Sequence, residues 1–177
     1  MALKNTLPSH WSTKKFVIQN STPDEIKALM KVYHAHSKLE KKGKKIKSIS
    51  PDTFIDMFSK NLIQLKGTNS IFHMQSIYLK ESSEIIGYFH LNYGIKDANM
   101  TLISALIIDS KYQNENFFKE IILNLVGQIK KLETYKYILT EVKLINKTVL
   151  AFWINSDFRT ILDFKSKNDS LILGRKL

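Results

Sequence analysis

The chain has 177 residues, 44% of them hydrophobic and 11% aromatic, which is the size and composition of one globular domain with a single core. It contains no cysteine, so a disulfide framework and a thiolate metal site are both excluded. Lysine and arginine outnumber aspartate and glutamate by 27 to 16, and the resulting net charge of +11 favours polyanionic partners such as nucleic acid, although lysine excess is also common simply as a source of solubility. We therefore predict one domain over residues 1–177.

The sequence favours a location in the cytoplasm. The first fifteen residues, MALKNTLPSHWSTKK, lack the apolar stretch of a secretion signal. No run approaches the roughly 20 apolar residues that a membrane-spanning helix needs, so we expect no membrane partner. Only Arg159 and Arg175 could offer the forked contacts that read nucleic-acid bases, so nucleic acid is a possible partner on charge alone.

The first elements in chain order are a short strand, 15–19, and two helices. Thr22, Pro23 and Glu25 have the spacing of a capping box with proline at the first helical position. Apolar residues at helical spacing follow, and a second helix begins in the same way at Ser50 and Pro51. Between the helices lie six lysines from Lys38 to Lys47, which form either a landing patch for an acidic partner or a solvated helix end and loop.

The second half of the chain is richer in strands. Residues 70–80, 85–94 and 100–109 are rich in β-branched and aromatic side chains and are joined by short turns, so they predict an antiparallel meander. A helix with an apolar stripe follows over 117–132, and then come a strand (136–145), a short helix (147–157) and two strands (160–165 and 170–177). We predict an α+β fold with a mixed, mostly antiparallel sheet of about seven strands and about four flanking helices.

Two segments of this order resemble signatures of the GNAT superfamily of acyl-CoA-dependent N-acetyltransferases. The first is LIIDSKYQNENFFKEII (106–122), which lies where the family has its Gln/Arg-x-x-Gly-x-Gly/Ala pyrophosphate loop. The second is NKTVLAFWINSDF (146–158), which follows the family spacing of an Asn, a small residue, an aromatic pair and a final Gly-Phe. The resemblance covers nearly the whole chain.

The resemblance implies transfer of an acetyl group from acetyl-CoA to a primary amine where two parallel strands, here 100–108 and 137–145, splay apart. Main-chain groups near Ile107 and Ile108 would pair with the pantetheine arm. The amides that open the helix at Phe117 would hold the pyrophosphate, since a helix N-terminus offers unpaired N–H groups and a positive dipole end. Asn146 and Trp153 occupy two further family positions on the cofactor side.

The loop departs from the family in its small residues. Gln113 matches the family pattern, but Asn116 stands at the first glycine and Phe118 at the last Gly or Ala. After glycine, asparagine is among the residues that best tolerate a left-handed backbone, and the loop has two, Asn114 and Asn116. The alternatives at this loop are a phosphate cradle without glycine and a plain helix N-terminus on an inherited fold.

The catalytic groups also differ from those that the resemblance implies. The family often places an acidic Tyr where this chain has Trp153, and an indole N–H cannot act as a proton acid near neutral pH. Glu141 is the best candidate for a general base, with a salt-bridged strand residue as the alternative, and Ser104 and His90 could anchor a water. His34 and His36 are two residues apart and do not form a metal pair on a helix, so we expect no metal.

Two functional hypotheses follow. One is an acetyl-CoA-dependent N-acetyltransferase whose amine acceptor is unknown. The other is a catalytically inactive GNAT-fold binding or regulatory module, which could bind a polyanion through the lysine-rich segment from Lys38 to Lys47. A homodimer is possible because family members commonly pair through their C-terminal strands, and residues 171–177 could form such an edge.

Overall fold

The computed structural model describes residues 5–40, 50–63 and 70–177, and within them the chain forms one sheet and its covering helices. The strands are β1 (His10–Ser12), β2 (Phe16–Asn20), β3 (Ile71–Leu79), β4 (Ile85–Tyr93), β5 (Met100–Ile108), β6 (Tyr137–Lys143), β7 (Thr160–Lys165) and β8 (Ser170–Lys176). The α-helices are α1 (Ile26–Glu40), α2 (Pro51–Lys60), α3 (Glu115–Lys130) and α4 (Lys147–Asn155), and the short 3-10 turns are η1 (Pro23–Glu25), η2 (Ser110–Tyr112) and η3 (Ser166–Asn168).

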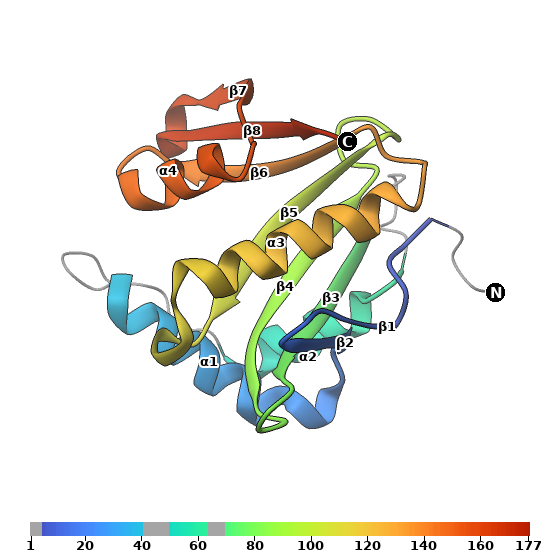
Figure 1. Cartoon of the computed structure of the whole chain (residues 1–177), viewed down its shortest axis with the longest axis vertical. Coiled ribbons are helices and arrows are strands. Elements are labelled where there is room, and N and C mark those ends of the chain that lie inside the picture. Colours follow the sequence, from blue (N-terminus) through green and yellow to red (C-terminus); the bar gives the residue numbers. More distant parts are fainter. Residues whose placement is uncertain (1–4, 41–49, 64–69) are drawn as a thin grey trace.

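The predicted α+β fold with a mixed sheet is confirmed. The sheet has eight strands in the order β1-β2-β3-β4-β5-β6-β8-β7 (Figure 1). The strand beyond the seven predicted is β1, whose three residues are too few to give a pattern in the sequence. It pairs with β2 through Trp11 and Ile18. β8 lies between β6 and β7, so the edge at this end of the sheet is β7 and not the C-terminal strand that we expected.

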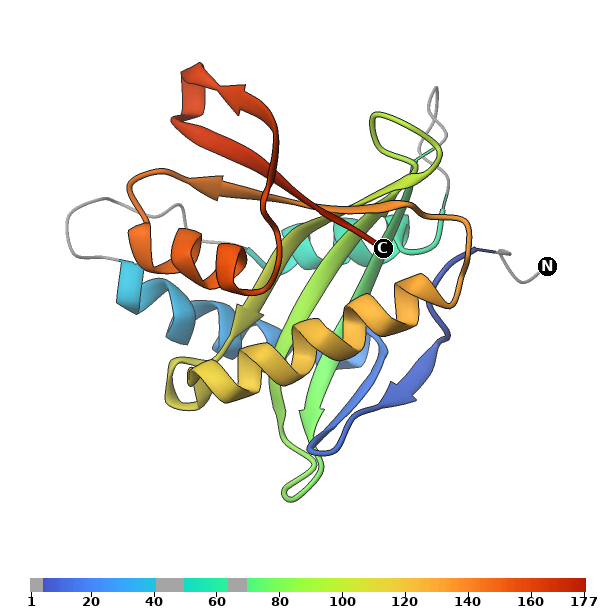
Figure 2. The ribbon, with the colours of Figure 1, turned by 45° about the horizontal axis from the view of Figure 1, so that its top comes forward.

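Two groups of helices cover the two faces of the sheet (Figures 1 and 2). α3 crosses one face, and α1 and α2 lie on the other, while α4 packs beside β6. The stripe of α3 that faces the sheet is buried, and burying each aliphatic side chain of this size contributes about 1.5–3 kcal/mol. The buried residues of that stripe are Ile121, Ile122, Leu125, Val126 and Ile129. Leu29, Val32 and Phe54 form a smaller core under α1 and α2 with Met74 and Tyr88.

The starts of α1 and α2 follow the signals in the sequence. The Glu25 carboxylate accepts a hydrogen bond from the Thr22 N–H at 3.3 Å, as the capping box requires. The same buried carboxylate accepts from the Ser76 hydroxyl at 2.5 Å and from the Tyr78 hydroxyl, which ties the start of α1 to β3. At α2, Ser50 is the N-cap and accepts from the Thr53 N–H at 3.3 Å.

The lysine-rich segment from Lys38 to Lys47 lies outside the part of the chain whose side chains are described. A role for it in binding a polyanion therefore stays a prediction. Among the described residues, no helix is long and apolar enough to cross a membrane.

Candidate active site

The sheet divides at β5 and β6, which are its one parallel pair among the described strands. The two strands are paired only from Met100 and Tyr137 to Ile103 and Thr140. Beyond these residues β5 stays with β4 and β6 stays with β8, so the strand ends diverge (Figure 2). We call this point the fork.

A β-bulge on β5 lies at the fork. His90 of β4 is opposite Ala105, whereas the next residue, Leu91, is opposite Ile103, so Ser104 is the extra residue. A bulge bends its strand and increases the local twist, which directs the end of β5 away from β6. The Ser104 hydroxyl accepts a hydrogen bond from the Asn92 side-chain amide at 2.8 Å.

Past the bulge, successive residues of β5 point their backbone N–H and C=O groups alternately toward β4 and toward the fork. The Asp109 N–H donates to the Ile86 carbonyl at 2.8 Å, and the Ile107 carbonyl lies 2.6 Å from the point where a Cβ on Gly87 would stand. Residues 107 and 109 therefore face β4, and because backbone groups alternate along a strand, Leu106 and Ile108 face the fork. Main-chain groups near Ile107 and Ile108 were predicted to pair with the pantetheine arm; those of Ile107 face β4, whereas those of Leu106 and Ile108 face the fork.

Gln113 is held against this edge of β5. Its side-chain amide nitrogen donates to the Ile108 carbonyl at 2.8 Å and to Nδ1 of His36 on α1 at 2.9 Å. The family-matching side chain thus links the end of β5 to α1. A ligand that pairs with the Ile108 carbonyl has to displace this contact or share the oxygen with it, since a carbonyl oxygen has two lone pairs.

The N-terminus of α3 follows directly. Asn114 is the N-cap, and its side-chain oxygen accepts from the Phe117 N–H at 2.9 Å, while its main-chain oxygen accepts from the Phe118 N–H at 3.2 Å. Along this described stretch of the chain, the N–H groups of Glu115 and Asn116 have no acceptor. Two amides at the positive end of a 16-residue helix are therefore available to an anion.

The backbone of the loop is not left-handed. Asn114 is extended, with φ −128° and ψ 153°, and Asn116 lies inside the first helical turn. Neither is among the described residues with positive φ, so the left-handed turn that asparagine could have supplied is not used. The helix begins at residue 115, two residues before the sequence predicted.

Aromatic rings occupy the space beside this helix start. Phe118 is half-buried, and its ring meets the Phe152 ring of α4 edge-on, with centroids 5.6 Å apart. Phe117 packs edge-on against buried Phe16 at 5.1 Å, and the Lys15 ammonium lies 4.9 Å from the Phe117 ring centroid. Phe118 therefore acts as a packing residue between α3 and α4.

The second family-like segment forms α4 and the turn after it. Asn146 is the N-cap of α4 and accepts from the Val149 N–H at 3.2 Å. Trp153 is buried, with 6% of its surface exposed, and packs edge-on against Phe158 at 4.8 Å. Asp157 stands at the family glycine and has a left-handed φ of 72°. The segment thus forms a capped helix and a left-handed turn at Asp157, with Trp153 packed in the core.

Glu141 lies immediately past the last β5–β6 pair, but its carboxylate already has partners. Lys165 donates to one oxygen at 2.5 Å and the Ser170 hydroxyl donates to the other at 2.7 Å. The hydrogen bond from Lys165, followed by that from Ser170, lowers the pKa of Glu141 below its usual value. A carboxylate with a lowered pKa is a weaker proton acceptor, so these contacts do not favour the predicted role of general base.

His90 is buried, with 8% of its surface exposed, and lies between the rings of Phe72 and Tyr88 at 5.2 and 5.3 Å. Burial lowers the pKa of His90 to about 4, so its ring is neutral near pH 7. Its Nε2 has no partner among the described atoms.

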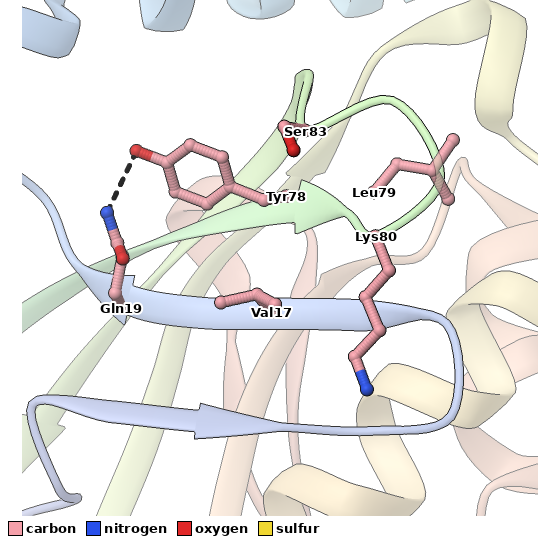
Figure 3. Close-up of a pocket in the computed structure, with 6 residues that line it drawn as sticks. All are labelled: Val17, Gln19, Tyr78, Leu79, Lys80 and Ser83. Atoms are coloured by element: carbon pink, nitrogen blue, oxygen red, sulfur yellow. Dashed lines mark hydrogen bonds between the residues drawn. The ribbon is translucent and has the colours of Figure 1, made fainter.

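Two hollows on the surface lie away from the fork. One is lined by Val17, Gln19, Tyr78, Leu79, Lys80 and Ser83 (Figure 3), where Gln19 donates to the Tyr78 hydroxyl at 3.1 Å. The other is lined by Pro23, Ile55, Phe58 and Ser59. No group of three or more His, Cys, Asp or Glu side chains in the described ranges could hold a metal ion.

No protein-family model and no curated protein matches the chain. Solved structures do match it. An acetyltransferase from Thermus thermophilus superposes with a TM-score of 0.74 at 15% identity, covering 94% of this chain and 100% of that one. The PaiA N-acetyltransferase from Thermoplasma acidophilum, solved in complex with coenzyme A, gives 0.71 at 15% identity, covering 92% and 99%. A GNAT-family acetyltransferase from Bacillus anthracis gives 0.69 at 10% identity, covering 94% and 98%. The chain has the fold of these GNAT-type acetyltransferases and is 10–15% identical to them in sequence.

The residues at the fork fit an acyl-CoA in two respects. The free amides of Glu115 and Asn116 suit a pyrophosphate, and the edge of β5 at Leu106 and Ile108 suits a pantetheine arm. Two features oppose it: the Gln113 amide already donates to the Ile108 carbonyl, and the Glu115 carboxylate adds negative charge to the first turn of α3. The role predicted for the loop stays a prediction, and Leu106 was not among the predicted residues, since the strand register that turns it to the fork has no signal in the sequence.

Proposed function

We propose that the protein is an acetyl-CoA-dependent N-acetyltransferase that acts on a primary amine. The observation that carries the proposal is the fork, where the parallel pairing of β5 and β6 ends after Ile103 and Thr140 while both strands continue. It is supported by the two free amides that begin α3 directly after β5 and by the coenzyme A complex of a protein with the same fold. Acetyl-CoA is the donor substrate, and no metal enters the reaction as proposed.

The transfer needs little proton chemistry from the chain. The amine nitrogen forms a bond to the thioester carbonyl carbon, the carbon–sulfur bond breaks, and the sulfur leaves with the electron pair. A thiol has a pKa of about 8.5, so the thiolate leaves readily and takes its proton from water. The acceptor loses one proton to water before it attacks, since only the neutral amine has a free electron pair, and its nitrogen loses a second proton to water once the bond to carbon has formed. Trp153 contributes packing against Phe158 and no proton.

The preorganised groups place the donor rather than activate it. Amides fixed at a helix start bind a diphosphate without reorganising, and each hydrogen bond to a charged group contributes about 1.5–3 kcal/mol. Backbone groups of Leu106 and Ile108 would align the pantetheine arm along β5. Holding the thioester and the amine in register is a large part of the acceleration that such a site can supply.

The second candidate is a GNAT-fold binding module that does not transfer an acetyl group. The observation that favours it is that the Phe117 and Phe118 amides and the Ile108 carbonyl are already bonded within the chain. Its partner would be a polyanion attracted by the +11 net charge, and such binding weakens steeply with salt.

Thiol release from acetyl-CoA in the presence of a panel of primary amines tests the first candidate against the second. We expect release above the rate with acetyl-CoA alone for at least one amine, with the acetylated amine found by mass spectrometry. Thiol release that no amine accelerates, combined with salt-sensitive binding of RNA or DNA, would favour the second candidate.

A further inference from the structure

The face of the fork opposite α3 carries a carboxylate that already holds an alkylammonium. Glu141 is the first residue of β6 past Thr140, and Ser104 is the first residue of β5 past Ile103. Val142 is buried in the core with α3, so its neighbour Glu141 points to the other face of the sheet. Ser104 lies on that face too, because its hydroxyl bonds to Asn92, whose neighbours Leu91 and Tyr93 belong to the core with α3. Glu141 and Ser104 are both exposed there, on the two sides of the fork.

The carboxylate is fixed more firmly than its cation. Glu141 is oriented by the hydroxyl of Ser170, a fully buried residue on the neighbouring strand β8. Lys165 comes from the edge strand β7, reaches past β8 on a flexible stem, and leaves 40% of its side chain exposed. An ionised carboxylate accepts up to about four hydrogen bonds, so its oxygens can bind another ammonium in place of Lys165 or beside it.

The Lys165–Glu141 pair also indicates which kind of ligand fits the carboxylate. Lys165 binds Glu141 through one primary ammonium on a straight alkyl chain, with Nζ 2.5 Å from the carboxylate oxygen. A charge-assisted hydrogen bond of this type discriminates between an alkylammonium and an amine that is uncharged near pH 7. Lys143, also exposed on β6, adds positive charge beside the carboxylate. Because Lys143 and Lys165 together repel a further cation, an ammonium ligand binds better once Lys165 has moved away.

We propose that Glu141 binds one primary alkylammonium of the acceptor, whose second amine attacks the thioester after losing its proton to water, and that Lys165 holds the place that the bound ammonium takes. The inference rests on the proposed function, because it names the acceptor class of the same fork. Glu141 is here a positioning residue for the cation and not a base. The acceptor is then an alkylamine of the lysine or diamine kind, and an aromatic amine is a poor substrate.

The direct test is calorimetric binding of cadaverine, an alkyl diamine, compared with aniline, which is uncharged near pH 7. Lys165→Met keeps the stem and removes the charge, and we expect it to bind cadaverine about tenfold more tightly than the wild type. Glu141→Gln should weaken binding about tenfold, and aniline should bind none of the proteins measurably. Lys96→Met is the matched control, since it breaks the other exposed lysine pair on this part of the sheet, Lys96–Asp163 at 2.9 Å, and should change binding less than about twofold.

Steady-state kinetics separate positioning from base catalysis. Lys165→Met should lower KM for cadaverine with kcat unchanged, and Glu141→Gln should raise KM. The inference is overturned if Glu141→Gln lowers kcat alone, if Lys165→Met binds cadaverine no better than the wild type, or if Lys96→Met has the same effect as Lys165→Met.

Titration of the same variants with acetyl-CoA reports separately on the proposed function. Acetyl-CoA binding without Glu141-dependent cadaverine binding would overturn this inference alone. Glu141-dependent cadaverine binding without acetyl-CoA binding would support the cation site and contradict the acetyltransferase.

Discussion

Lowering the pH from 7 should destabilise the protein well before its carboxylates titrate, because two buried histidines must stay neutral in the fold. Burial lowers the pKa of His73 to about 4 and that of His90 to about 4, from an ordinary 6.5. His73 is fully buried. Its Nε2 lies 2.7 Å from the Asn20 side-chain oxygen, an acceptor, so Nε2 donates and Nδ1 accepts from the Tyr93 hydroxyl at 3.1 Å. A second proton, on Nδ1, would break the bond to Tyr93.

The sign and size follow from the direction of the shift. Between the two pKa values the unfolded chain binds more protons than the folded one, so the contribution of each histidine is complete above about pH 6.5 and is lost as the pH falls toward 4. A drop from 6.5 to about 4 corresponds to ~3.4 kcal/mol per histidine at ~1.36 kcal/mol per pH unit. About 2 kcal/mol of each is lost between pH 6.5 and 4.5, or about 4 kcal/mol together, a large part of a typical stability of about 5–15 kcal/mol.

Urea unfolding followed by tryptophan fluorescence at several pH values measures this loss. Glu84, Glu141 and Asp163 also have lowered pKa values, but they contribute below about pH 4.5, so the window from 6.5 to 4.5 isolates the histidines. His73→Gln and His90→Gln should each remove about half of the slope. A free energy of unfolding that stays constant across the window, or a slope that both variants leave intact, would refute the reasoning.

Three further outcomes are expected. Gly87→Ala should cost about 1–3 kcal/mol in urea unfolding, because its Cβ would meet the Ile107 carbonyl at 2.6 Å; unchanged stability would mean that β4 and β5 are not this close. Trp153→Phe should leave kcat within about threefold, since the indole only packs, and a hundredfold loss would make it catalytic. Asn114→Ala should lower stability by about 1 kcal/mol by removing the side-chain cap of the Phe117 amide. The amide keeps only its 3.2 Å bond to the Asn114 main-chain oxygen, so coenzyme A should bind at least as tightly; weaker binding would mean that the Asn114 side chain itself holds the phosphate.

The elements of this fold were readable because their signals are local. The apolar stripe of α3 and the capping residues Thr22, Glu25 and Ser50 lie within a few residues of what they stabilise, and the structure confirms them. The sequence predicts the start of α3 at the aromatic pair Phe117–Phe118, but the helix begins at Glu115 with Asn114 as its cap, so the predicted start is wrong by two residues. Local chemistry therefore predicts which elements exist better than it predicts where they begin.

The fork was anticipated only through the resemblance, and its details depend on strand register. The bulge at Ser104 decides whether Ile107 or Leu106 faces β6, and no residue pattern marks that choice. Glu141 of β6 is paired with Lys165 of β7, although β8 lies between the two strands. Contacts between strands distant in sequence are fixed by the order of the sheet, which the sequence alone did not give.

Titration calorimetry of the purified protein with coenzyme A and acetyl-CoA at moderate salt tests the central claim most directly. If the amides of Glu115 and Asn116 and the edge of β5 at the fork hold an acyl-CoA, both ligands should bind in the micromolar range, with the binding heat lost for pantetheine, which has no pyrophosphate. Absence of binding at millimolar ligand would show that the fork has kept the GNAT architecture without its donor substrate, and would contradict the account.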